Sequence, residues 1–232
     1  MKKLFISILA LFTLHSVFAG DFYSSDIQII FGLGEDSATY NEGSFNLIKH
    51  EYKNTNMNIE VESWNIFKLN SLFGLGFMLS GEAGITKTSS IIQKDFTHTQ
   101  TQTSIPEKNL SFALQWSALL GPAVTFSIPD SLIIGVSAGL AYKATSFAYK
   151  VSSTDKIDSF AGFGWGVNLN VKLFPNTPTC FVGGVKLLST FPEKLYYGTD
   201  TSSIKMYEMD SKPINDANNL YMGFYIGTSF NL

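Results

Sequence analysis

The sequence contains no arginine, because all 16 of its basic residues are lysines. Arginine forks are the usual means of clamping a carboxylate or phosphate with two parallel hydrogen bonds, so their absence counts against such a clamp and against a strongly anion-selective pore. An AT-rich coding sequence is the other explanation for the missing arginine. The 19 acidic residues outnumber the lysines and set the net charge at -3. This balance offers no basic footprint for a nucleic acid.

Cysteine and charge are also scarce. The single cysteine, Cys180, excludes an internal disulfide framework, and we expect it to be a small buried side chain. Charged residues make up 15% of the chain, against roughly 25% in soluble domains. Beyond the first residues no apolar run is long enough for a transmembrane helix. The apolar residues must therefore be arranged in another way.

Residues 1–19 read as a secretory signal peptide and residues 20–232 as one mature domain. The segment carries Lys2 and Lys3, continues with the apolar stretch 4–14 and reaches the small residue Ala19, after which we expect cleavage. A spanning helix would need roughly 20 apolar residues, and this stretch is shorter. Cleavage removes two lysines and no acid, which changes the net charge from -3 to -5.

Strict alternation of apolar and small polar residues fills most of the mature chain. The segment 162–173 shows it most clearly, with Phe163, Trp165 and Val167 on one face and glycine or asparagine on the other. Pro122 interrupts one such segment and predicts a bulge or bend. This period of two is typical of β-strands. Eight segments show it: 26–34, 57–69, 73–86, 109–128, 134–143, 162–173, 181–187 and 220–232.

The composition of the polar face favours a membrane barrel over a soluble one. A soluble lipocalin-like barrel, which remains the alternative fold, would cover its water-facing side with Lys, Glu, Asp and Thr. Here that face is mostly Gly, Ser, Ala and Asn, which suits a narrow lumen, and the other face suits lipid. The sequence therefore predicts an all-β, eight-stranded, antiparallel, up-and-down transmembrane β-barrel.

The connecting segments alternate in length, as they do in outer-membrane barrels. Residues 70–72, 129–131 and 175–178 form tight turns, whereas 35–54, 87–108, 147–158 and 192–218 are longer and polar, and we expect them to be loops. Short turns face the periplasm in such barrels, so both termini would lie there. We expect a monomer in the lipid bilayer of a bacterial outer membrane.

The last strand carries a resemblance to a known class. Residues 220–232 alternate and end in Ser229-Phe230-Asn231-Leu232. Together with the signal peptide and the eight segments, this ending resembles the small outer-membrane barrels that include the OmpA, OmpX and OmpW families. Length and loops look most like OmpW-type barrels or small barrels of spirochaetes. The resemblance implies that the barrel-assembly machinery reads Phe230 and Leu232, although the class commonly ends in an aromatic residue.

The predicted inward face carries charges that would meet inside the barrel. Opposite charges in a confined interior should pair, since an unpaired buried charge is costly. The pairs would form either a structural plug or a gated polar passage or binding site. The residues concerned are Glu60, Glu62, Glu82, Lys143, Lys186, Lys68 and Lys172, of which Lys68 and Lys172 lie nearest the periplasmic end.

No pattern in the sequence indicates catalysis, a metal or a cofactor. His50 and His98 fall in predicted loops, so neither a metal cluster nor an inward Ser/His/Asp set is expected. The OmpW-like resemblance implies a non-enzymatic barrel that passes or binds small, hydrophobic solutes. The alternative is a closed structural or surface-interaction barrel, adhesin-like or antigen-like, that acts through its extracellular loops.

Overall fold

The computed structural model describes residues 23–42, 48–96, 101–129, 131–199 and 209–231. The expected signal peptide, His98 and Leu232 lie outside these ranges, so cleavage after Ala19 and the terminal part of the assembly signal stay predictions. Within the described ranges no helix is long and apolar enough to cross a membrane.

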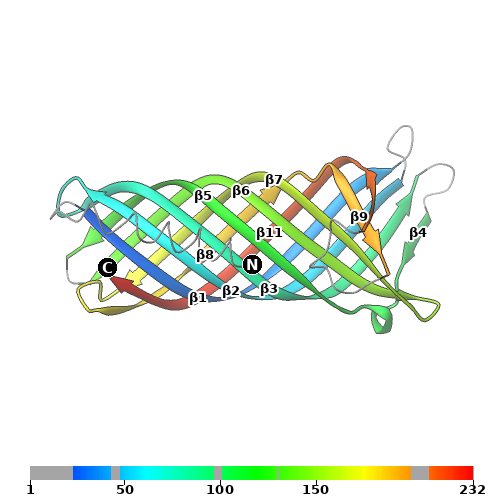
Figure 1. Cartoon of the computed structure of the whole chain (residues 1–232), viewed down its shortest axis with the longest axis horizontal. Helices are drawn as coiled ribbons and strands as arrows, with labels where there is room; N and C mark the ends of the chain where they lie inside the picture. Colours follow the sequence, from blue (N-terminus) through cyan, green and yellow to red (C-terminus); the bar gives the residue numbers. More distant parts are fainter. Residues whose placement is uncertain (1–22, 43–47, 97–100, 130, 200–208, 232) are drawn as a thin grey trace.

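Eight long antiparallel strands close into a ring (Figure 1). Each pairs with the next along the chain, and the last pairs with the first through contacts such as Phe31 with Ile226. This confirms the predicted all-β, antiparallel, up-and-down barrel. The strands are β1 (Tyr23–Glu42), β2 (Ile48–Lys68), β3 (Phe73–Asp95), β5 (Phe112–Ile128), β6 (Leu132–Val151), β7 (Thr154–Leu173), β8 (Thr179–Thr190) and β11 (Asn215–Asn231).

Three short strands bring the sheet of the described residues to eleven, and all three lie at one end of the barrel. β4 (Thr101–Ser104) pairs with the end of β3, β9 (Lys194–Gly198) pairs with β7 beyond the point where β8 stops, and β10 (Asp210–Pro213) pairs with β9. We call this the loop end, and we call the opposite end, where tight turns join β2 to β3 and β5 to β6, the turn end.

The strands run further toward the loop end than the sequence predicted. Residues 147–158, expected to be a loop, form the end of the β6–β7 hairpin with a two-residue turn at Ser152 and Ser153. Both serines have positive φ, 48° and 69°, as the twist of a tight hairpin requires. Much of 35–54 and 87–95 is likewise strand. The sequence did not predict these extensions because their outward residues are polar, so the alternation of apolar and polar residues is lost there.

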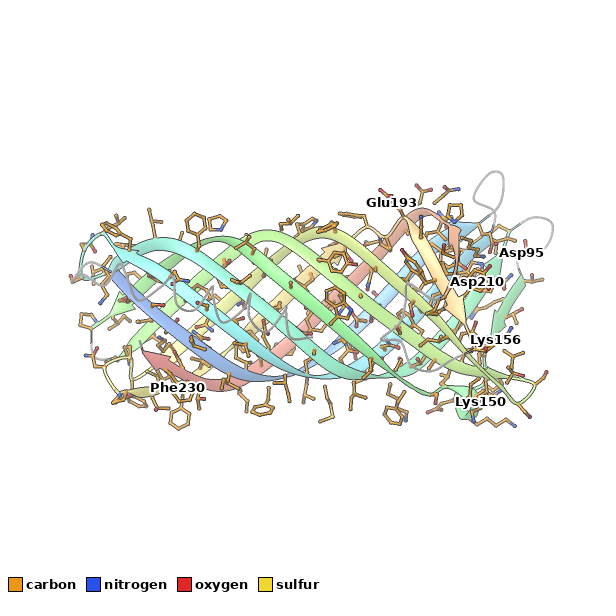
Figure 2. All side chains as sticks on the ribbon, viewed as in Figure 1. Asp95, Lys150, Lys156, Glu193, Asp210 and Phe230 are labelled. Atoms are coloured by element: carbon orange, nitrogen blue, oxygen red, sulfur yellow. The ribbon has the colours of Figure 1, made fainter. Side chains whose placement is uncertain are left out.

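That belt is the outward face of the ring. Phe31, Phe77, Phe163 and Phe224 are 60 to 64% exposed, and Trp165, Leu140 and Ile59 are exposed beside them. The predicted lipid-facing parity is therefore confirmed. Such a continuous exposed apolar surface is stable in a bilayer and not in water. Phe230 is exposed on this face at the turn end (Figure 2).

The inward face is built from small residues that let neighbouring backbones approach closely. A Cβ on Gly139 would lie 2.1 Å from the carbonyl oxygen of Leu120, and one on Gly121 would lie 2.2 Å from that of Ala138. The bulge expected at Pro122 is wrong, because the register of β5 against β3 continues through it. Pairing with β6 is interrupted between Leu120 and Ala123, so the missing N–H of the proline is tolerated there.

Candidate functional site

Lys186 is at the centre of the charged groups inside the barrel. It projects inward from β8, is 2% exposed, and forms an ion pair with Glu60 of β2. Its Nζ also lies 3.4 Å from Glu62 Oε1 and donates a hydrogen bond of 3.2 Å to Ser80 Oγ. Strands from opposite sides of the ring are thus tied together across the lumen.

Lys143 of β6 forms a second pair a little nearer the loop end. Its Nζ lies 3.2 Å from Asp36 Oδ1 and donates to Gln115 Oε1 at 2.8 Å, with neither charged side chain exposed. The same ammonium lies 4.4 Å from the centre of the Tyr221 ring. Gln115 in turn donates to Glu82 Oε1 at 3.3 Å, so Glu82 joins this group through an amide.

Glu62 is held by neutral donors as well as by Lys186. The Trp64 indole donates to Oε2 at 2.8 Å, and Asn168 Nδ2 donates to Oε1 at 2.6 Å. Asn168 Oδ1 accepts from the Tyr225 hydroxyl at 2.7 Å. The structure therefore gathers Glu60, Glu62, Glu82, Lys143 and Lys186 into one buried layer, which we call the charged layer.

The two remaining lysines of the predicted cluster lie nearer the turn end. Lys172 is buried and forms an ion pair with Asp26 of β1. Lys68, in contrast, is exposed where β2 ends and lies at the rim of the turn-end cavity, away from the charged layer. Lys68 has the inward position in the alternation, but it is the last residue of β2, so the barrel wall does not surround it. Asp26 and Asp36 are the acids that complete the pairs.

Side chains fill the middle of the lumen around the charged layer. A buried apolar cluster that includes Trp64, Met78, Leu119, Leu188 and Tyr221 packs beside it, with Met78 and Leu188 fully buried. A cavity of about 600 Å³ opens at the turn end and one of about 670 Å³ at the loop end, and their linings share no residue. The described side chains thus separate two chambers.

The loop-end cavity is lined by residues of eight strands, from β1 round to β10, which place tyrosines and carboxylates on its wall. Its floor is the buried aromatic cluster formed by Tyr40, Tyr52, Phe147 and Phe160 with Leu195. Tyr52 and Phe160 make an edge-to-face contact at 5.2 Å between ring centres. Its lining includes Tyr40, His50, Tyr52, Ser104, Tyr149, Lys156, Asp158, Tyr197, Asp210 and Lys212.

Asp158 is the buried acid of this cavity. It projects from β7, and its Oδ2 accepts hydrogen bonds from the hydroxyls of Tyr52 at 2.8 Å and Tyr149 at 3.0 Å. Burial raises the pKa of the Asp158 carboxyl, while the two tyrosine hydrogen bonds act in the opposite direction. Burial also raises the pKa of each of these tyrosines, so both remain hydrogen-bond donors.

A second group on the wall joins β1, β2 and β10. Glu42 accepts from Lys212 at 2.7 Å and contacts His50 Nε2 at 2.9 Å, and the His50 ring stacks on Tyr40 at 4.4 Å. The Lys212 hydrogen bond holds the pKa of Glu42 below its ordinary value. Burial lowers the pKa of His50, although Glu42 opposes that shift. His50 was expected in a loop but lies on β2.

A bulge shapes the cavity on its β3 side. The register of β2 against β3 shifts between Lys53 and Asn54, so Ser89 has no partner on β2. The inward parity passes from Thr88 to Ile91, and both are buried. A bulge changes which side chains face inward, and here it brings Ile91 into the aromatic cluster. A break of alternation at Ser89-Ser90 was the available signal.

The polar side chains of the described ranges do not gather as a metal centre. No group of three His, Cys, Asp or Glu side chains within the described ranges could hold a metal ion. Among the hydrogen bonds of these residues, the His50 ring contacts a glutamate and not a serine or cysteine. The geometry instead offers a cavity lined by aromatic rings, hydroxyls and carboxylates, which is suited to non-covalent binding.

Solved structures share this fold at low sequence identity. The outer-membrane protein OprG of Pseudomonas aeruginosa matches with a TM-score of 0.52 and 10% identity, covering 90% of this chain and 95% of that one. The outer-membrane protease OmpT of Escherichia coli matches with a TM-score of 0.50 and 7% identity, covering 91% and 97%. No family model and no curated protein sequence matches. The chain therefore has the fold of the small outer-membrane barrels.

Proposed function

We propose that this chain is a non-enzymatic outer-membrane barrel that binds small solutes in its loop-end cavity, above a closed middle. One observation carries the proposal: a cavity of about 670 Å³ lies at the loop end and is separated from the turn-end chamber by buried side chains. That volume falls within the roughly 300–1,000 Å³ of small-molecule sites. Its aromatic floor suits the apolar part of a solute.

The same geometry argues against free passage through the barrel. A solute crossing the lumen would have to part the pairs of Lys143 and Lys186 and the apolar cluster around Leu119. Breaking a buried ion pair costs about 3–5 kcal/mol. Binding at one end needs no such rearrangement, so we place binding ahead of passage.

Placement of the loop end outside the cell belongs to the proposal. It follows from cleavage after residue 19, assembly through the Phe230 and Leu232 signal, and the rule that short turns face the periplasm. Charged side chains gather at the loop end, including Asp95, Lys150, Lys156, Glu193 and Asp210 (Figure 2).

A second candidate is contact with other molecules through the projecting loop end. The observation that favours it is β4, whose four residues Thr101–Ser104 are all exposed and pair only with β3 among the described strands. Such an exposed edge can accept a strand from another chain. Loss of surface adhesion in Thr101→Pro, at a β4 position that does not line the cavity, with solute binding retained, would favour this role.

The test uses two tryptophan substitutions on the same strand. Ser104 lines the cavity and Gln102 does not, so Ser104→Trp should fill it while Gln102→Trp serves as the matched control. A set of small neutral, anionic and cationic compounds is screened by ligand-observed NMR against refolded protein in lipid nanodiscs. We expect compounds that bind the wild type and Gln102→Trp but not Ser104→Trp.

Planar-bilayer recording supplies the second half of the test. The wild type should show no stepwise ionic conductance, because the charged layer and the apolar cluster close the lumen. Steady conductance steps would overturn the closed middle. A screen in which no compound distinguishes Ser104→Trp from Gln102→Trp would overturn binding in the cavity.

A further inference from the structure

The loop-end cavity already holds one ammonium group against a tyrosine and a carboxylate. Lys212 Nζ lies 5.6 Å from the centre of the Tyr40 ring and donates to Glu42 Oε1 at 2.7 Å. An ammonium over an aromatic face is attracted by the negative charge of the ring face, and a carboxylate strengthens the site. The Lys212 ammonium, held by Tyr40 and Glu42, is therefore an example of the cationic group that the rest of the cavity wall could bind.

Asp158 provides a second carboxylate in which one oxygen is unused. Its Oδ2 accepts both tyrosine hydrogen bonds, whereas Oδ1 accepts none from the described residues and keeps exposed surface on the cavity. The residue as a whole is 7% exposed, and no lysine nitrogen of the described residues lies within ion-pair distance of it. A carboxylate oxygen that faces the cavity from a largely buried residue favours a cationic hydrogen-bond donor.

Tyr197 and Asp210 extend the arrangement along one row of the sheet. In the register Asp158 lies opposite Tyr197, and Tyr197 lies opposite Asp210. Side chains opposite one another on antiparallel strands share a face, so Tyr197 stands between two acidic residues in this row. All three line the cavity.

The charge of the wall also favours a cation. Asp158 and Asp210 are the acids of the lining, and Lys156 and Lys212 are its bases. Lys212 is already paired with Glu42, which lies outside the lining, so Asp158 and Asp210 face Lys156 as the one lining lysine without that partner. An anion would be repelled by the Asp158 and Asp210 carboxylates, and a neutral solute would gain less than a cation from the Asp158 Oδ1 acceptor.

We propose that the loop-end cavity binds primary organic ammonium cations, with the ammonium on Asp158 Oδ1, the Tyr197 ring beside it, and the apolar part of the ligand on the aromatic floor. This inference rests on the proposed function, because it names the class of solute that the same cavity takes. Primary ammonium is the form that supplies N–H donors for Oδ1.

Three probes of one size and different charge test the class. Benzylammonium, benzyl alcohol and benzoate are titrated into refolded wild type at constant ionic strength and about pH 7, where an alkylammonium is charged. We expect benzylammonium to bind about tenfold or more tightly than benzyl alcohol, since a hydrogen bond to a charged group contributes about 1.5–3 kcal/mol. Benzoate should bind most weakly.

Variants assign the effect to the named residues. Asp158→Asn should weaken benzylammonium binding about tenfold or more and abolish the preference over benzyl alcohol. Asp155→Asn, on the same strand but beside Lys150 and away from the cavity, is the matched control and should bind like the wild type. If Asp158→Asn fails to fold, Tyr197→Leu tests the same site, with an expected loss of about two- to fivefold for benzylammonium only.

The outcomes separate the two proposals. Equal or tighter binding of benzyl alcohol or benzoate, abolished by Ser104→Trp, would overturn the ammonium class and leave solute binding intact. The same holds if none of the three probes binds while other compounds still distinguish Ser104→Trp from Gln102→Trp. If no compound distinguishes those two variants, both proposals fail.

Discussion

Lys186 and Lys212 each pair with glutamate inside the same ring of strands, but in opposite surroundings. Lys186 is 2% exposed within the membrane-spanning part, and Lys212 is 36% exposed at the loop end. Removal of one partner of a buried pair leaves a charge without water, whereas an exposed partner is rehydrated. This difference indicates that the charged layer keeps the middle of the barrel closed, whereas charged groups at the loop end can exchange a protein partner for water or a ligand.

The surrounding side chains reinforce this difference. Around Lys186 the partners come from opposite walls, and a buried apolar cluster packs beside them. Around Lys212 the partners are Glu42 and the Tyr40 ring on the wall of an open cavity. Binding is therefore expected where charges are partly hydrated, and closure where they are not.

Substitution of Lys186 by methionine should have the largest effect on the free energy of unfolding. Lys186→Met keeps the length of the side chain but leaves Glu60 and Glu62 without their cation, so the free energy of unfolding should fall by about 3–5 kcal/mol. Urea unfolding of the refolded barrel, followed by tryptophan fluorescence, measures it. Lys53→Met, at an exposed outward position, is the control. A change below about 1 kcal/mol would place Lys186 in hydrated surroundings.

The charged layer could be predicted from the sequence because alternation is a local property. Once Ile59 and Val61 are assigned to lipid, Glu60 and Glu62 must face inward, and the structure buries both. The pairing of Lys186 with these two residues could not be predicted, because it depends on the register of strands on opposite sides of the ring. Asp36 was missed because it follows the apolar part of β1, in a segment expected to be a loop.

The loop-end cavity was not predicted for the same physical reason. Tyr40, Tyr52 and Asp158 alternate with polar neighbours, since above the apolar belt both faces of a strand meet polar surroundings, and the pattern that marks a membrane strand disappears. Closure of the ring then brings these residues together from β1, β2 and β7. The register shift at Lys53 and Asn54 was indicated in the sequence only by the break of alternation at Ser89-Ser90 on the partner strand.

A glycine substitution inside the barrel should have an intermediate effect on the free energy of unfolding, because strand backbones pack closely in the closed middle. A Cβ on Gly139 would lie 2.5 Å from Gly121 Cα, whereas one on Gly81, on the outward face, has nothing within 4 Å. We expect Gly139→Ala to lower the free energy of unfolding by about 1–3 kcal/mol. Gly81→Ala, the matched control, should change it by less than about 0.5 kcal/mol. Equal effects in the same urea assay would contradict close strand packing at this position.

Substitution of Lys212 should have the smallest effect, and its pH dependence tests whether the loop-end pair is hydrated. Lys212→Met should lower the free energy of unfolding by less than about 1 kcal/mol near neutral pH, because both side chains are partly exposed and His50 remains beside Glu42. Lys212 lowers the pKa of Glu42, so its stabilisation is present above the unfolded pKa of the carboxyl and is lost as pH falls through the folded pKa. Unfolding curves of wild type and variant should thus converge in acid. A loss of unfolding free energy as large as that of Lys186→Met, or one that persists in acid, would show that Lys212 is as poorly hydrated as Lys186.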